Sequence, residues 1–196
     1  MSVSRLFVGT FLSAEQQLLL GQLCEDNDSL VSLWGYKLRW VKAAKLHMTW
    51  SFLGDVATGK VPELAQSLSA VVAGRGRCQV SYDNLVFWPS AAGPRQMVLT
   101  PAVVSESVAV MAADMRRSLS ECTAQAETRE FCPHITLTRF DVMSKPKSAE
   151  KLSLPEWFPA HKFLPLVHRI TSVDLIVSHI GSMRDDYEVV RSFPLV

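Results

Sequence analysis

Apolar and polar residues alternate along several short stretches of the chain, and in three longer stretches apolar residues recur every three or four positions. The first pattern is typical of half-buried strands and the second of amphipathic helices. Strands are predicted at residues 5–12, 38–41, 45–53, 78–88, 96–99, 131–140, 168–178 and 187–195. Helices are predicted after Ser13, from Val61 until Gly74, and from Ser105 to Cys122.

Residues at the ends of these stretches support the predicted boundaries. Ser13 followed by Gln16 matches a capping box, in which each side chain bonds the backbone of the other residue. Pro62 suits the first turn of the second helix, where its missing N–H costs little. Gly54, followed by Asp55, is expected to end the strand that begins near residue 45.

Two of the predicted strands carry the same motif, a histidine followed two positions later by a threonine. The first pair is His47 with Thr49, and the second is His134 with Thr136. Residues i and i+2 of a strand point to the same side, so each histidine shares a face with its threonine. The intervening apolar residues point to the opposite side, where they can pack in a core.

This pair of motifs has a chemical use. An imidazole can take or give a proton near neutral pH, and a threonine hydroxyl can donate a hydrogen bond to a phosphate oxygen. Two facing copies would supply one base, one acid and two hydroxyl donors around one phosphate, and no metal would be needed. A single His-x-Thr is common and a strand histidine is more often structural, so the interpretation depends on having two copies.

The two motifs and their surroundings resemble those of the two-histidine phosphoesterases, in particular the RNA 2′,3′-cyclic phosphodiesterases, also called 2′-5′ RNA ligases. The resemblance spans nearly the whole chain and includes segments 5–8, 40–41, 47–54, 131–139, 173–178 and 187–190. It implies an α+β fold of two pseudo-symmetric lobes, each an antiparallel sheet with helices on the outside, flanking a central cleft. Residues 1–196 would form a single two-lobed domain with one motif from each half.

The resemblance also implies roles for six residues. One histidine would activate water and the other would protonate the leaving ribose oxygen; we expect His134 as the base and His47 as the acid, with the reverse order left open by the pseudo-symmetry. Thr49 and Thr136 would hold the non-bridging oxygens of the phosphate.

Arg139 and Phe52, each five residues after a histidine, match positions of the family's nucleotide site. Strict alternation puts them on the face opposite to the histidines, so they reach the site only if the strands bend, bulge or end there. Phe52 could instead pack in the core, and Arg139 could instead form a salt bridge.

Composition and charge limit the kinds of substrate and cofactor that the sequence favours. The net charge of +1 gives no global basic field for long nucleic acid, which favours a small substrate or a short RNA end. Four basic residues precede the first motif, an arrangement that is more often a solvated face: Lys37, Arg39, Lys42 and Lys45. The four cysteines form no C-x-x-C pair, and no phosphate- or dinucleotide-binding fingerprint is present, so we expect no metal and no cofactor.

The remaining expectations concern location and activity. No secretory signal or membrane-spanning run is visible, so a cytoplasmic monomer is expected. The leading hypothesis is a metal-independent hydrolase that opens RNA 2′,3′-cyclic phosphates to 2′-phosphomonoesters, reversible as a 2′-5′ RNA ligase. The alternatives are a phosphodiesterase for another small cyclic nucleotide phosphate or a 2′-5′ oligonucleotide, and a nucleotide- or RNA-binding module without catalysis.

Overall fold

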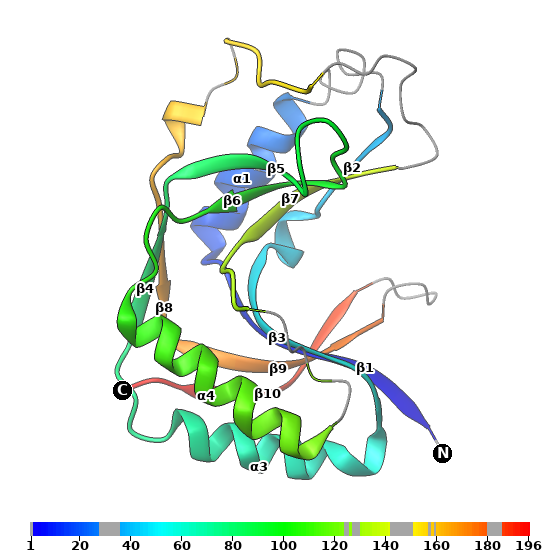
Figure 1. The fold of residues 1–196 in the computed structure, drawn as a ribbon, viewed down its shortest axis with the longest axis vertical. Coiled ribbons are helices and arrows are strands. Elements are labelled where there is room, and N and C mark those ends of the chain that lie inside the picture. Colours follow the sequence, from blue (N-terminus) through cyan, green and yellow to red (C-terminus); the bar gives the residue numbers. More distant parts are fainter. Residues whose placement is uncertain are drawn as a thin grey trace.

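The computed structural model describes residues 2–27, 36–123, 126, 130–141, 151–156, 158, 160–179 and 186–196 of the chain. Its strands form two antiparallel half-sheets, one above the other in Figure 1, joined between β3 and β7. The lower half-sheet has the order β10 (Tyr187–Pro194), β9 (Ser172–Ser178), β1 (Val3–Phe11), β3 (His47–Ala57). The upper half-sheet contains β7 (Ile135–Phe140), β6 (Gln96–Thr100), β5 (Asn84–Trp88) and, on the other edge of β7, β2 (Leu38–Trp40).

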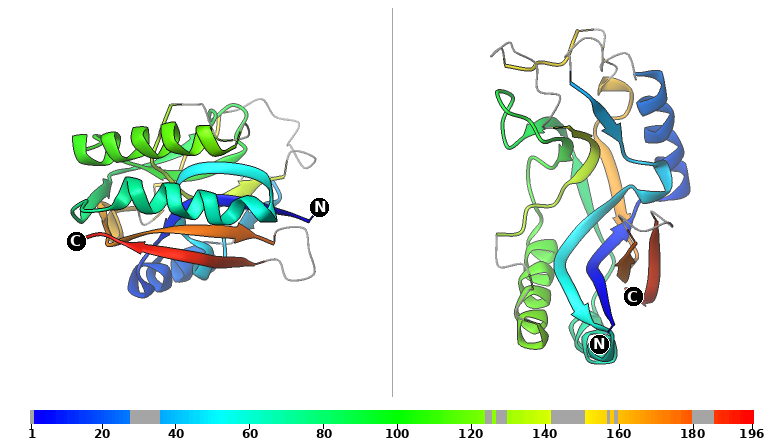
Figure 2. Two further views of the ribbon diagram at one scale, coloured as in Figure 1. Left: turned by 90° about the horizontal axis from the view of Figure 1, so that it is seen from below. Right: turned by 90° about the vertical axis from the view of Figure 1, so that its right-hand side faces the viewer.

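The helices and a small sheet complete the two lobes. Helices α3 (Val61–Val72) and α4 (Glu106–Cys122) pack against each other and lie beside the lower half-sheet, whereas α1 (Ala14–Asp26) lies behind the upper one (Figures 1 and 2). Strands β4 (Cys78–Tyr82) and β8 (Leu166–Ile170) form a separate two-stranded sheet. The described residues also include 3-10 turns at Ala43–Lys45 (η1), Thr58–Lys60 (η2) and Ala160–Lys162 (η4). The α+β fold with two antiparallel lobes is confirmed.

Local signals in the sequence account for the helix boundaries. The capping box is confirmed, because the backbone N–H of Gln16 donates to the Ser13 hydroxyl and its side chain accepts from the Ser13 N–H. Pro62 lies in the first turn of α3, as predicted. The buried residues of α4 recur every three or four positions and face the core: Val108, Met111, Ala112, Met115 and Leu119. This spacing explains why α4 packs against α3 and β3.

Two strand predictions were wrong because a polar turn was missed. Residues 78–88 form two strands in different sheets, and the chain changes direction at Asp83. Its carboxylate accepts hydrogen bonds from the Ser81 hydroxyl and the Ala102 backbone N–H, which holds the turn. Residues 168–178 likewise divide at Thr171, whose carbonyl accepts from the N–H of Leu195. The β9–β10 hairpin is confirmed, and its turn lies outside the described residues.

Two other boundaries also differ from the prediction. Gly54 does not end β3, because its φ of 68° lets the chain form a bulge and continue to Ala57. The strand predicted over 131–140 begins only at Ile135, so His134 directly precedes β7.

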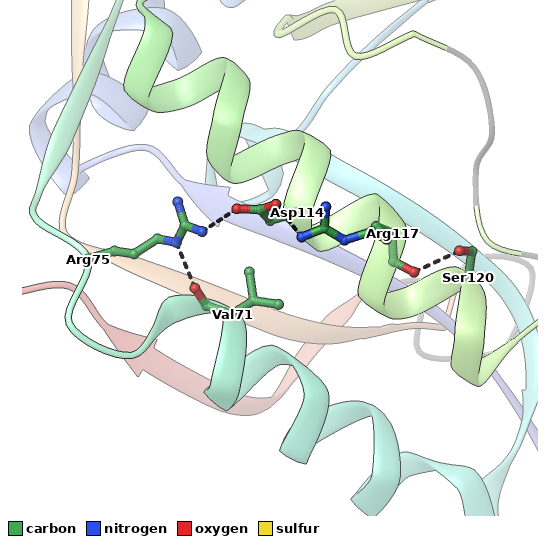
Figure 3. Close-up of polar contacts among 5 residues, drawn as sticks. All are labelled: Val71, Arg75, Asp114, Arg117 and Ser120. Atoms are coloured by element: carbon green, nitrogen blue, oxygen red, sulfur yellow. Dashed lines mark hydrogen bonds and ion pairs between the residues drawn. The ribbon is translucent and has the colours of Figure 1, made fainter.

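An ion cluster links the end of α3 to α4 (Figure 3). The Arg75 guanidinium bonds the Asp114 carboxylate of α4, and its Nε donates to the Val71 carbonyl over 2.7 Å. Arg117 pairs with the same carboxylate over 2.7 Å. Asp114 therefore pairs with both guanidiniums, and the cluster is a structural link between the helices. No helix among the described residues is long and apolar enough to cross a membrane.

The buried His168 should make stability depend on pH. Its side chain is 1% exposed, its Nε2–H donates to the Phe11 carbonyl, and no described group accepts from or donates to its Nδ1. Burial lowers the pKa of His168 from 6.5 to about 4. Folding therefore excludes a proton that the unfolded chain binds, so stability is full above pH 6.5 and is lost as the pH falls towards 4.

We predict that the free energy of unfolding decreases between pH 6.5 and 4 by on the order of 3 kcal/mol from His168 alone. Urea titrations across this range should show a smaller decrease for His168→Gln, which keeps an N–H donor but cannot titrate. An identical pH dependence of the two proteins would contradict the prediction.

Candidate active site

The two histidines are brought together by one backbone pair, Met48 of β3 with Ile135 of β7. Both side chains of this pair are fully buried in the core. In an antiparallel pair the neighbours run in opposite directions, so this register places His47 towards Thr136 and Thr49 towards His134. The structure thus brings the two predicted His-x-Thr pairs into one site.

Strand β3 contains a bulge three residues after its histidine. Thr49 pairs with Gly9 and Ser51 pairs with Val8, so Trp50 is an extra residue on β3. Trp50 is buried and its Nε1–H donates to the Thr10 hydroxyl over 2.9 Å, which fixes the bulge against β1. Beyond Trp50 the alternation is shifted by one position.

Strand β7 repeats this arrangement at the equivalent position. Thr136 pairs with Val98 and Thr138 pairs with Met97, so Leu137 is the extra residue. From the histidine onward, both strands then show the same order of burial: half-buried, buried, half-buried, buried, buried, exposed. The two halves of the chain are therefore alike in backbone as well as in motif.

The two bulges bring Phe52 and Arg139 to the face of the histidines. Ser51 and Thr138, the preceding residues, are buried, whereas Phe52 is 45% exposed and Arg139 is exposed. The positive charge of Arg139 contributes to lowering the pKa of His47. The requirement for a bend or bulge is thus met at both positions, and Phe52 is not a core residue.

Both imidazoles are held in the same way. His47 Nδ1 lies 2.6 Å from the carbonyl oxygen of Lys45, and His134 Nδ1 lies 2.9 Å from that of Cys132. A carbonyl can only accept, so each Nδ1 carries the proton and donates it. Nε2 is therefore the nitrogen of each ring that does not bond this carbonyl.

Aromatic rings enclose His47. The ring centroids of Phe7, Phe11 and Tyr187 lie 4.9, 5.9 and 5.3 Å from that of the imidazole. A Cβ at Gly9 would lie 3.1 Å from a Phe7 ring carbon and 3.4 Å from His47 Cδ2, so glycine permits this close packing. Burial lowers the pKa of His47 from 6.5 to about 4, the Lys45 carbonyl opposes the shift, and the charges of His134 and Arg139 add to it.

His134 has a more open environment. Its ring is half-buried, and the Trp88 ring lies 4.5 Å away between centroids. The sequence analysis missed the aromatic neighbours of both histidines: Phe7, Phe11, Trp88 and Tyr187. They come from β1, β5 and β10, and only cross-strand register, which periodicity does not give, places them here.

The arrangement can carry out proton transfer on both sides of a bound group. The Met48–Ile135 pair lies between two imidazoles that can each accept or donate a proton. Two threonine hydroxyls and the Arg139 guanidinium belong to the same part of the sheet. Within the described part of the chain, no group of three or more His, Cys, Asp or Glu side chains could hold a metal ion. The two imidazoles are groups of this site that can transfer protons near neutral pH.

Known proteins similar to this chain are phosphoesterases by name. Residues 29–98, which include the first motif, match the family described as LigT like Phosphoesterase. The RNA 2′,3′-cyclic phosphodiesterase of Aquifex aeolicus (strain VF5) is 23% identical, with 100% of this chain and 99% of that protein covered. The protein of the same name from Geobacillus stearothermophilus is 26% identical over 100% of this chain and 59% of its own length. These matches agree with the resemblance to the two-histidine phosphoesterases that the sequence carries.

Solved structures have the same fold as this chain. E. coli LigT complexed with 3′-AMP matches with a TM-score of 0.75 and 21% identity, covering 100% of this chain and 99% of that one. TT0787 of Thermus thermophilus matches with a TM-score of 0.75 and 19% identity over 97% of each chain. The family resemblance found in the sequence is confirmed.

We predict that His47 titrates at about pH 4 in the ligand-free protein. Tyr187→Ala should raise this pKa towards 6.5, because removing the ring admits water to the imidazole and lowers the cost of charging it. NMR titration of the histidine ring signals measures both values. Val190→Ala, an exposed position on the same strand, serves as the control and should leave the His47 titration unchanged.

Proposed function

We propose that this protein is a LigT-like phosphoesterase that hydrolyses RNA 2′,3′-cyclic phosphodiester ends to 2′-phosphomonoesters without a metal ion, and can run in reverse as a 2′-5′ RNA ligase. The observation that carries the proposal is the pair of imidazoles, each anchored through Nδ1, on either side of the Met48–Ile135 pair. Two relatives named RNA 2′,3′-cyclic phosphodiesterase support the choice of substrate.

The proposed reaction uses each imidazole once. One histidine removes a proton from water through Nε2 as the water oxygen attacks phosphorus. The P–O3′ bond breaks, and the other histidine donates its Nε2 proton to the leaving O3′, so that a 2′-phosphomonoester and a free 3′-hydroxyl result. Thr49 and Thr136 donate hydrogen bonds to the non-bridging oxygens, whose negative charge increases in the transition state.

The order of the two histidines depends on the pKa of His47. With His134 as base and His47 as acid, the order expected from the sequence, His47 must be protonated when substrate is bound. Its pKa of about 4 must then rise on binding, and the negative charge of the phosphate acts in that direction. The reverse order needs no such rise, because neutral His47 is already the form that accepts a proton.

Arg139 and Phe52 complete the proposed substrate site. A guanidinium can pair with phosphate oxygens through two parallel N–H groups, and a phenyl ring can stack on a base. We propose that residues 1–196 act as one two-lobed domain and as a monomer in the cytoplasm, on RNA ends or on small nucleotides with a cyclic phosphate. E. coli LigT structures with 3′-AMP and with NADP+ support a nucleotide ligand.

The test is incubation with a short RNA that ends in a 2′,3′-cyclic phosphate, followed by separation of the 2′- and 3′-phosphate products. Exclusive formation of the 2′-phosphate in the presence of a chelator supports the proposal. Hydrolysis of another cyclic nucleotide phosphate or a 2′-5′ oligonucleotide, but not of this RNA, would favour the second hypothesis. Tight RNA binding without turnover would favour a binding module.

His47→Ala and His134→Ala should each reduce kcat about 10²- to 10⁴-fold, because each removes one general acid or base. The double variant should lose much less than the product of the two effects, since the groups act as a unit. His179→Ala is the matched control, because His179 pairs with Glu188 at the end of β9 and belongs to neither motif. Retention of more than about a tenth of kcat by either single variant would contradict the roles.

Arg139→Lys should lower kcat/KM about tenfold. Lysine keeps the charge but loses the planar fork, so about one hydrogen bond to a charged group is lost in the transition state. The melting temperature should change little, since Arg139 forms no ion pair with the described carboxylates. Arg169→Lys, at an exposed position on β8, is the control. Parallel loss of activity and stability would assign Arg139 a structural role.

A further inference from the structure

Four side chains lie next to each other across the upper half-sheet, on four adjacent strands. Arg39 of β2 pairs with Arg139 of β7, Arg139 pairs with Gln96 of β6, and Gln96 pairs with Trp88 of β5. Directly paired residues of adjacent strands project to the same face of a sheet. We call Arg39, Arg139, Gln96 and Trp88 the cross-strand row.

The cross-strand row is continuous with the candidate active site. The Trp88 ring lies 4.5 Å from that of His134, and the charge of Arg139 acts on the pKa of His47. The neighbours of Arg39, Leu38 and Trp40, pack against the core on the opposite face. The row therefore lies on the histidine side of the sheet. Arg39 is at the end of the row, next to Arg139 and farthest from Trp88.

The two arginines of the row are not neutralised by the protein. Both are exposed, and neither forms a hydrogen bond or an ion pair with a carboxylate in the part of the chain that the structure describes. Like charges directly opposite each other on neighbouring strands are destabilising. No described carboxylate relieves this repulsion between Arg39 and Arg139. An anion bound between the two guanidiniums would relieve it.

The length and the chemistry of the row fit a single strand of nucleic acid. With neighbouring strands about 4.8 Å apart, the row extends over about 14 Å, which exceeds the roughly 3.4 Å rise of one stacked nucleotide. Guanidiniums at one end can bind phosphates, an indole at the other can stack on a base, and the Gln96 amide can bond base edges or a 2′-hydroxyl.

We propose that the cross-strand row binds the nucleotides that precede the cyclic end of a single-stranded RNA, with Arg39 on a phosphodiester group upstream of the reacting phosphate. This inference rests on the proposed function. It assigns Arg39 a part in recognising the RNA chain, whereas the histidines and Arg139 act at its end. The protein then prefers oligonucleotides over mononucleotides.

The test compares two substrates, a nucleoside 2′,3′-cyclic monophosphate and a tetranucleotide with a 2′,3′-cyclic end. The measured quantity is kcat/KM for the tetranucleotide divided by kcat/KM for the mononucleotide. Arg39→Ala should lower this ratio about fivefold, because one exposed ion pair with the RNA is lost. Arg39→Lys should retain most of the ratio because it keeps the charge. Arg169→Ala, an exposed arginine on β8, is the matched control and should leave the ratio unchanged.

Salt dependence provides a readout that a structural role would not change. Loss of one phosphate contact should reduce the slope of log kcat/KM against log salt concentration for the tetranucleotide by about 0.7. The melting temperature of Arg39→Ala should not fall, because the substitution removes a like-charge pair. An unchanged substrate ratio and an unchanged slope would overturn the proposal.

Failure of the proposed function gives a different result. If the wild-type protein hydrolyses neither substrate, the catalytic proposal fails, and the row is then tested by binding alone. Fluorescence anisotropy with the labelled tetranucleotide should show about fivefold weaker binding by Arg39→Ala than by the wild type. Equal affinities would overturn the assignment of the row.

Discussion

The pairing of Met48 with Ile135 is the constraint on which the site depends. This backbone contact joins β3 to β7, and its two side chains are buried in the common core. Each motif histidine is the residue immediately before its member of this pair, so the separation of the two rings follows from the register. A shift by one residue would turn one histidine into the core and would move its threonine with it.

The two halves have the same local backbone conformation around the histidine, but the side chains that surround the two histidines differ. Each has a histidine whose Nδ1 is held by the carbonyl two residues earlier and a bulge at the third residue after it. Around His47 the lower lobe places three aromatic rings, whereas His134 is flanked by Trp88 and stays more open. Burial is therefore what makes two equivalent positions chemically different.

Much of the site could be predicted from local sequence pattern. The shared faces of the His-x-Thr pairs follow from alternation, and the cap at Ser13 from side-chain chemistry. The bulges at Trp50 and Leu137 could not be predicted, because an extra apolar residue in a strand is indistinguishable from a core residue until its partner strand is known. Alternation placed Phe52 and Arg139 on the wrong face for the same reason. Nothing in the local pattern placed the ring of Tyr187 beside His47, because that contact depends on cross-strand register.

The unequal exposure of the two imidazoles affects how the site returns to its starting state. In the proposed reaction each turnover ends with the protonation states of the histidines exchanged, since the base has gained a proton and the acid has lost one. A proton must then travel between the rings or through the solvent before the next cycle. Three aromatic rings lie around His47, whereas Trp88 lies against His134 in the described part of the chain, so we expect bulk buffer to re-equilibrate His134 more readily than His47.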